Sequence, residues 1–451
     1  MRPPGFDPVF VSNPRSAAVA AAHSVGPDRW SRAYGAVTDL LAPRFARHEP
    51  LRNAGSFMLG LLSSLERKNC WTISEDRGRE TPYAFQHLLS RASWDADAVR
   101  DDLRGYVVGA FGECDGIYVL DETGDLKAGT ESVGVQRQYT GTAGRIENSQ
   151  VTVCMTYVGR RGHAFIDRAL YLPKSWTGDR ERCRKASVPD DVEFATKPTL
   201  AGDMLTRAVA AGVPAGWVAG DEVYGGNPAL RAKIRGLKLG YVLMIACNQH
   251  VPTPAGPMPA EQCAKLAPKA NWQRVSAGRG SKGERYYDWL WCDLVPEDDE
   301  DRGHHWLLVR RNRSTGELAY LRCYNPRRVP LRALIRVAGQ RWRIEESFQA
   351  AKELAGLDQH QVRKWKSWHR WTTLAMLAHA FLAVATAIER AHAPAPTSMI
   401  ALTVNEFRRL FDALHLRQNP TIEGLLAWSA WRRRHQATAR ACHYRRRAND
   451  Q

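Results

Sequence analysis

The stretch Ile117–Asp121, IYVLD, is a short run of apolar residues that ends on an acid. Runs of this length rich in β-branched and aromatic residues are typical of buried strands. Two similar runs follow, GWVAGD at 216–221 and GYVLMIAC at 240–247. Helical patterns at 199–211 and 229–235 alternate with them. This alternation of strands and helices predicts an α/β fold.

Two of these predicted strands end on an aspartate. Asp121 closes the first run, and Asp221 closes the second. In open α/β sheets, functional groups gather at the carboxyl ends of the strands. We therefore expect the two carboxylates to lie close together at one edge of the sheet.

A third acid stands in QRWRIEESFQAAK, residues 340–352, which we interpret as one continuous helix. Positions three, four and seven apart share a helix face, so Arg341, Glu345 and Lys352 fall in one row. An acid between two cations stays ionised, which suits Glu345 to binding a metal ion while the cations face a phosphate backbone. The same row also fits a solvated ladder of ion pairs on the surface of a helix.

Together these acids predict a site for divalent cations. Carboxylate oxygens are ligands that Mg²⁺ prefers, and Asp121, Asp221 and Glu345 would supply them. Two ions about 3.5–4 Å apart activate a water or a 3′-hydroxyl and stabilise the leaving oxygen of a phosphodiester. The three acids therefore indicate metal-dependent phosphodiester chemistry.

Each of these acids has a second carboxylate close to it in the sequence. Glu122 and Glu222 directly follow the two aspartates, but neighbours on a strand point to opposite faces, which favours the aspartates. Glu346 competes with Glu345, and it lies a helical step of about 100° away from the row of cations. We interpret Asp115 and Asp125 as loop acids.

The composition indicates a polyanionic partner. The 451 residues include 64 lysines and arginines against 47 aspartates and glutamates, a formal charge of +17. Nucleic acid is the commonest partner of so basic a chain. Lys127, Arg137 and Arg145 lie near the ends of predicted strands, where they would bind phosphate or serve as ordinary exposed cations.

The cysteines and the apolar segments indicate an intracellular protein. Nine cysteines form no CxxC pair, which favours reduced thiols over a disulfide framework or a zinc site. The first ten residues lack the apolar region of a secretory signal, so we expect a cytoplasmic protein. The apolar run at 372–388 is short for a membrane span and contains threonines and a histidine, so we expect a core helix.

Changes in sequence character predict five regions. Residues 1–112 form a helical region that is a candidate for binding DNA ends. Residues 113–247 form the first part of the α/β core, and residues 248–328 an all-β insertion. The core resumes over 329–392 with the helix of Glu345. Residues 393–451 form a helical C-terminal region that ends in a basic tail.

Three segments carry a resemblance to a known family. VLDETG (119–124), AGDEVYG (219–225) and RWRIEESFQAAK (341–352) resemble the DDE transposases of bacterial insertion sequences. The chain looks closest to the branch whose RNase H-like core has a β-rich insertion before the last acid. That branch has the signature Tyr-x2-Arg-x3-Glu-x6-Lys, in which the tyrosine position is Ala338 here. The resemblance covers most of residues 50–390.

The resemblance implies roles for these residues. Asp121, Asp221 and Glu345 would ligate two Mg²⁺ ions, with Mn²⁺ as a substitute, and Arg341 and Lys352 would contact DNA phosphate near the cut. The implied substrates are double-stranded terminal inverted repeats and target DNA, held by a homodimer in the nucleoid. Two further hypotheses stay open: a DNA-binding derivative that no longer cuts, and a general nuclease of the same core without a joining step.

Overall fold

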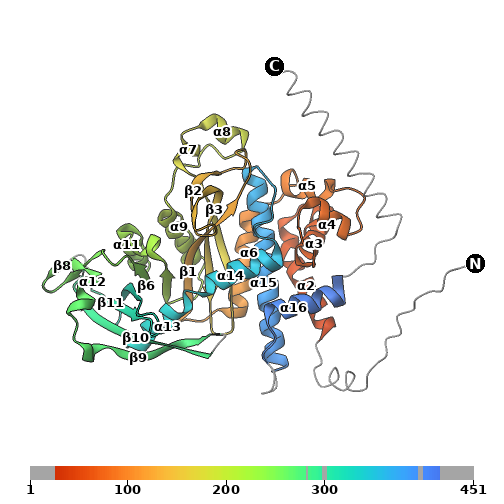
Figure 1. Cartoon of the computed structure of the whole chain (residues 1–451). Helices are drawn as coiled ribbons and strands as arrows, with labels where there is room; N and C mark the ends of the chain where they lie inside the picture. The colour runs from red at the N-terminus through yellow and green to blue at the C-terminus, as the bar shows by residue number, and fades with distance from the viewer. Residues whose placement is uncertain (1–25, 281–282, 297–301, 395–399, 417–451) are drawn as a thin grey trace, which may run out of the picture.

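A computed structural model describes residues 26–280, 283–296, 302–394 and 400–416. The helical N-terminal region lies at one end of the molecule, the strands β9–β11 lie at the other end, and β1 lies between them (Figure 1). The arginines of the basic tail, and the first 25 residues of the predicted N-terminal region, lie outside the described residues.

The described part of the N-terminal region consists of helices joined by short loops, without strands. Its α-helices are α2 (Pro27–Leu41), α3 (His48–Leu62), α4 (Cys70–Asp76), α5 (Tyr83–Ser90) and α6 (Ala96–Phe111), with a short 3-10 helix, η1 (Ala42–Arg44). Side-chain caps define two of the starts, because Asn69 begins α4 with a capping box and Asp95 begins α6.

Helix α15 (Trp365–His392) joins this region to the rest of the protein. It packs against α2, α3, α5 and α6 of this region and against α14, α16 and β4. By length and composition it is apolar enough to cross a membrane, but 89% of its apolar window is buried inside the protein. The structure therefore confirms the expected core helix, which begins seven residues before the apolar run at 372–388.

The sheet is built around β1. Its first six strands are β1 (Ile117–Leu126), β2 (Gln136–Thr140), β3 (Arg145–Val158), β4 (His163–Tyr171), β5 (Trp217–Gly220) and β6 (Gly240–Ile245). Strand β1 pairs antiparallel with β3 and parallel with β5, β3 also pairs with β4, and β5 pairs parallel with β6. The predicted α/β sheet is therefore present.

The prediction that Asp121 closes its strand is wrong. Strand β1 continues to Leu126 because its polar second half, ETGDL, pairs residue by residue with β3. The parallel ladder with β5, in contrast, stops at Leu120 and Gly220. Asp121 therefore lies where the parallel pairing ends rather than where the strand ends.

Helices connect the strands of this core. They are α7 (Lys174–Thr177), α8 (Arg180–Lys185), α9 (Lys197–Ala210), α10 (Glu222–Gly225) and α11 (Pro228–Gly236). Thr196 caps α9 and Asn227 caps α11, and each helix has proline in its first turn, where a missing N–H costs nothing.

The predicted insertion is not all-β, and most of its strands belong to the sheet of the core, while β7 and β8 pair with each other in a two-stranded sheet. Its strands are β7 (His250–Thr253), β8 (Gly256–Pro259), β9 (Gln273–Gly280), β10 (Gly283–Leu294), β11 (His304–Arg311) and β12 (Leu318–Asn325). It also contains the helix α12 (Ala260–Leu266) and the 3-10 turn η2 (Lys269–Asn271). Strand β12 pairs with β6, so β9–β12 extend the core into one ten-stranded sheet.

The stretch 340–352 is not one continuous helix. Helix α13 (Leu331–Gln340) ends and α14 (Arg343–Ala355) begins shortly after it, with Arg341 and Trp342 between them. Helix α14 ends at Gly356, whose φ of 63° is left-handed, as is common for glycine at helix ends. The remaining described helices are α16 (Val404–Phe411) and the π-helical turn η3 (Asp412–Leu416).

Candidate active site

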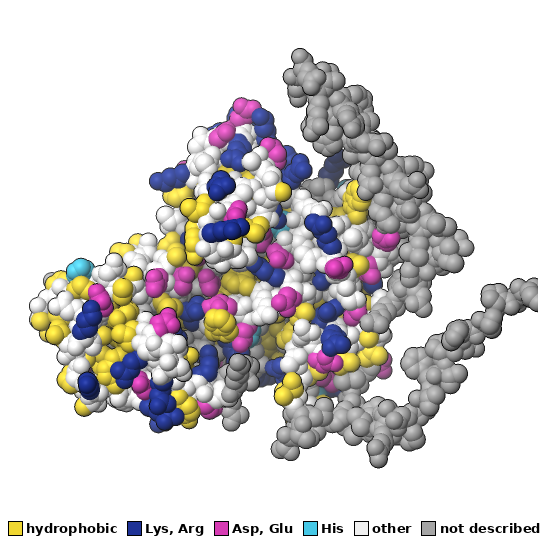
Figure 2. Space-filling model, in the orientation of Figure 1, with side chains coloured by type: hydrophobic (Ala, Val, Ile, Leu, Met, Phe, Trp, Pro, Cys, Tyr) yellow, Lys and Arg dark blue, Asp and Glu magenta, His cyan; other side chains and the backbone are white. Residues whose placement is uncertain are grey.

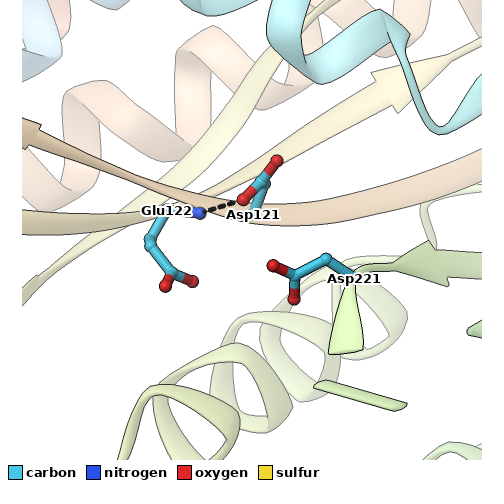
Figure 3. Close-up of side chains that lie close together, drawn as sticks. All are labelled: Asp121, Glu122 and Asp221. Atoms are coloured by element: carbon cyan, nitrogen blue, oxygen red, sulfur yellow. Dashed lines mark hydrogen bonds between the residues drawn. The ribbon is translucent and has the colours of Figure 1, made fainter. Parts of the chain in front are cut away.

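The register of two parallel strands brings Asp121 and Asp221 together. The last residues that β1 and β5 pair are Leu120 and Gly220, and the next residue in each segment is the aspartate. Carboxylate oxygens of Asp121, Glu122 and Asp221 all lie within 4.8 Å of one another, as Figure 3 illustrates. Two of the three acids predicted from the sequence therefore meet, and their roles as metal ligands stay a prediction.

The third predicted acid, Glu345, is connected to this cluster through the side chain of Arg341. The Arg341 guanidinium donates a hydrogen bond to Glu345 Oε1 at 2.7 Å and lies 3.9 Å from Asp121 Oδ2. Arg341 belongs to the short connection between α13 and α14. In this arrangement Arg341 bridges two acids, where the sequence predicted a row along one helix.

Burial and neighbouring negative charge favour the protonated forms of the two aspartates. Burial, together with the charge of Asp221, raises the pKa of Asp121 to about 8, although Arg341 opposes both effects. Burial and the charge of Glu122 raise the pKa of Asp221 to about 6. A divalent cation would compensate the negative charge, so these hard oxygen donors fit a bound Mg²⁺ or Mn²⁺.

A comparison with protein families identifies this arrangement. Residues 40–282, more than half of the chain, match the family model described as DDE superfamily endonuclease. The chain belongs to the DDE superfamily endonucleases. The matched segment includes Asp121 and Asp221, and it ends before Glu345.

Two individual proteins are similar to this DDE-family chain. The probable transposase for insertion sequence element IS701 of Microchaete diplosiphon is 26% identical over 196 residues, which is 43% of this chain. The chain spans about half, 48%, of that relative's length. A cryo-EM structure of the piggyBac transposase synaptic complex with hairpin DNA aligns with a TM-score of 0.39 and 11% identity, covering 82% of this chain and 71% of that one.

Glu122 lies in the acid cluster, although strand alternation favoured its neighbour. The Asp121 carboxylate accepts a hydrogen bond from the N–H of the next residue, Glu122, at 2.8 Å, and the Glu122 side chain extends from the other side of β1 (Figure 3). Lys197 Nζ donates to Glu122 Oε1 at 2.6 Å, and the Tyr224 hydroxyl donates to Oε2 at 2.8 Å. Sequence reasoning missed both donors, although Tyr224 stands in the same AGDEVYG segment as Asp221.

Glu346 and Glu222 differ from the clustered acids in their surroundings. Glu346 accepts a hydrogen bond from Arg343 at 2.6 Å and lies 3.3 Å from His163 Nε2. Although burial opposes the shift, the hydrogen bonds to His163 and Arg343 lower the pKa of Glu346 to about 2. Glu222 is exposed on α10. Neither shares the contacts that join Glu345 to the cluster.

One acid interpreted as a loop residue is part of the sheet. Asp125 is buried in β1, and its Oδ2 lies 3.1 Å from His360 Nε2. Although burial opposes the shift, the hydrogen bond to His360 lowers the pKa of Asp125, with smaller contributions from Lys127 and Lys352. Asp115 does lie in a loop, where its carboxylate is 3.2 Å from Arg160.

The predicted DNA-binding cations differ in their surroundings. Lys127 is partly buried and donates to the His360 carbonyl oxygen at 3.1 Å, and burial lowers its pKa. Arg137 is exposed on β2, and Arg145 is exposed on β3 with Glu147 at 2.9 Å. Lys352 on α14 acts electrostatically on Asp125. Their contact with DNA stays a prediction.

Proposed function

We propose that this chain is a DNA transposase that cuts and rejoins the ends of an insertion sequence. The main observation behind this proposal is that Asp121 and Asp221 lie close together, one residue beyond the parallel ladder of β1 and β5. Membership of the DDE endonucleases and the likeness to an insertion-sequence transposase over part of its length support the proposal.

The fold of the core supports the finer proposal of an RNase H-like domain. The strand order is β4-β3-β1-β5-β6, in which β4, β3 and β1 are antiparallel neighbours and β1, β5 and β6 are parallel. Among these five strands, the first and the fourth in chain order lie side by side. Those are the strands that position Asp121 and Asp221.

The acids would hold two divalent cations, with Mg²⁺ as the natural ion. Bound ions would activate a water or a 3′-hydroxyl and stabilise the leaving oxygen of the phosphodiester. Asp121 and Asp221 are close enough to share an ion, and their pKa values are raised by burial and by neighbouring negative charge, which a cation would offset. Glu345 would complete the ligand set when Arg341 releases it for a phosphate contact.

The charge of the chain supports DNA as the partner. The excess of 17 positive charges favours a polyanion. On the face in Figure 2, lysines and arginines are spread among acids over the described surface. We propose binding to double-stranded inverted repeats and target DNA, as a homodimer in the nucleoid, with contacts from Arg341, Lys352, Lys127, Arg137 and Arg145.

Cleavage of a duplex that carries the element's inverted repeat tests the proposal. With Mg²⁺ or Mn²⁺ the parent chain should nick the repeat end, and Asp121→Asn, Asp221→Asn and Glu345→Gln should each lose on the order of 10³-fold in rate. Glu222→Gln is the matched control, because Glu222 is an exposed acid next to Asp221. Equal cleavage by all three site variants would refute the assignment.

Product analysis separates transposition from simple cutting. Joining of the cleaved end to a target plasmid is expected for a transposase. A general nuclease would give cleavage without joined product, and a DNA-binding derivative would bind the repeat without metal-dependent nicking. Either of these results would replace the proposed function.

A further inference from the structure

The two aspartates lie just beyond the hydrogen bonds that align their strands. The β1–β5 ladder ends at Leu120 and Gly220, so backbone pairing between these strands does not fix the spacing of the next residues. Asp121 is held to its own strand through the Glu122 N–H. Asp221 is held to α10, where its carboxylate accepts a hydrogen bond from the Val223 N–H at 2.9 Å.

A side-chain hydrogen bond connects α10, which Asp221 caps, to β1, which contains Asp121. The Tyr224 hydroxyl on α10 donates to Glu122 Oε2 on β1 at 2.8 Å, and the Tyr224 side chain is fully buried. Helix α10 itself is pressed against β6, because a Cβ at Gly225 would lie 1.8 Å from the Met244 carbonyl oxygen. The bond therefore joins a fixed helix to the strand residue next to Asp121.

A third element keeps Glu122 in place. Lys197, at the start of α9, donates to Glu122 Oε1 at 2.6 Å, so each carboxylate oxygen of Glu122 has its own donor. The lysine charge also offsets the repulsion that a third carboxylate adds beside Asp121 and Asp221. Glu122 is thus held from two sides by α9 and α10.

We propose that Glu122 is a positioning residue, which through its hydrogen bond to Tyr224 sets the spacing between the Asp121 and Asp221 carboxylates for a divalent cation. The inference rests on the proposed function, because it requires that the two aspartates bind the ion. It assigns the acid cluster two ligands, Asp121 and Asp221, and one supporting residue, Glu122, in place of three equivalent ligands.

Metal coordination depends on such support. Mg²⁺ and similar ions require ligand oxygens at closely defined distances. Loss of a group that orients a ligand typically weakens metal binding about 10–100-fold. Loss of the Tyr224 hydroxyl leaves the charge of the site unchanged. Its effect on metal binding therefore reports the spacing of the Asp121 and Asp221 carboxylates rather than a change in charge.

Tyr224→Phe tests the proposal without DNA and without catalysis. Titration with Mn²⁺, followed through the electron paramagnetic resonance signal of the free ion, should show about tenfold weaker binding than the parent. Tyr118→Phe is the matched control, because Tyr118 is buried on the same strand as Glu122 and donates to the Val213 carbonyl at 3.0 Å. The control should bind Mn²⁺ like the parent, and thermal melts of both variants should show that each is folded.

Coupling between the two partners gives a second readout. Glu122→Ala should weaken Mn²⁺ binding, and adding Tyr224→Phe to it should weaken binding no further, because both changes remove the same bond. Additive losses would overturn the inference. Parent-like Mn²⁺ binding by Tyr224→Phe would overturn it as well. Loss of one bound Mn²⁺ per chain in Glu122→Ala would also overturn it, because Glu122 would then be a ligand.

The aspartate variants separate this inference from the proposed function. If Asp121→Asn and Asp221→Asn bind Mn²⁺ like the parent, the proposed metal site is wrong. If they lose binding while Tyr224→Phe retains it, the metal site stands and only the positioning role of Glu122 fails.

Discussion

The two aspartates and Glu345 are held in the same site by different means. Asp121 and Asp221 each follow directly after a paired residue, Leu120 or Gly220, so the ladder places their backbones side by side although it does not fix the spacing of their carboxylates. Glu345 comes from α14, and the Arg341 side chain joins it to Asp121. One half of the site is set by the sheet, and the other half is set by an ion pair.

This difference separates a preformed part of the site from an adjustable part. Moving the aspartates far apart would require breaking the ladder, whereas moving Glu345 requires only a change of partner for one guanidinium. We therefore expect Asp121 and Asp221 to bind a cation before DNA is present, and Glu345 to contribute once a phosphate competes for Arg341. The following predictions test that comparison, from the largest expected effect to the smallest.

Asp121→Asn should have the largest effect on metal binding in the absence of DNA. Because this residue belongs to the preformed pair, we expect Mn²⁺ binding about 100-fold weaker than in the parent, which corresponds to about 2.7 kcal/mol. Glu345→Gln should change the affinity by less than about threefold. Isothermal titration calorimetry checks both, and equal losses would remove the distinction between the two halves.

Metal binding should also depend steeply on pH. The cation must displace a proton from Asp121, whose pKa without metal is about 8, so the apparent Mn²⁺ affinity should rise by roughly tenfold from pH 6 to pH 7 and level off above pH 8. Mn²⁺ titrations in a series of buffers measure this. A flat profile over that range would show that Asp121 is already ionised.

Without metal, the same aspartate should destabilise the fold at neutral pH. Its pKa is raised in the folded state, so the penalty is absent below about pH 4, grows as the pH rises, and is complete above about pH 8. Asp121→Asn should therefore stabilise the metal-free protein by at least about 2 kcal/mol at pH 8 and have little effect at pH 4. Thermal melts in chelator check this, with Asp190→Asn as an exposed control; destabilisation by Asp121→Asn at pH 8 would contradict the prediction.

Arg341→Gln should have the smallest of these effects, which is an increase in Mn²⁺ affinity. The guanidinium lies 3.9 Å from Asp121, so its removal should strengthen Mn²⁺ binding about threefold without DNA. Arg343→Gln is the matched control, because Arg343 pairs with Glu346 instead. Weaker Mn²⁺ binding in the Arg341 variant would mean that this arginine supports the acids rather than competing with a cation.

The sequence was informative where local pattern and structure agree. Apolar runs before Asp121 and Asp221 do form neighbouring parallel strands, and the apolar segment near the C-terminal end does form the buried helix α15. Pattern alone missed the second half of β1, because ETGDL looks like a loop until its pairing with β3 is known. The segment forms a strand because it pairs with a distant part of the chain, although its local composition favours a loop.

The third acid shows a different limit. The spacing of Arg341 and Glu345 predicted their contact correctly, since the ion pair forms at 2.7 Å. The break between α13 and α14 was not visible, because helical spacing continues through Arg341 and Trp342, whose backbones keep helical angles. The contacts of Lys197 and Tyr224 with Glu122 join residues 75 and 102 positions away from it, and no local pattern encodes them.

The pairing of β12 with β6 has a mechanical consequence. Because this pairing makes one sheet of the core and the β9–β12 extension, the two parts cannot rotate as separate bodies without losing main-chain hydrogen bonds. A force applied at the β9 edge of the sheet, for example by a bound duplex, would be transmitted across the sheet toward β5 and the aspartates. Amide hydrogen exchange should then slow in β12 and β6 together when DNA binds, and slowing confined to β9 and β10 would show that the two parts respond independently.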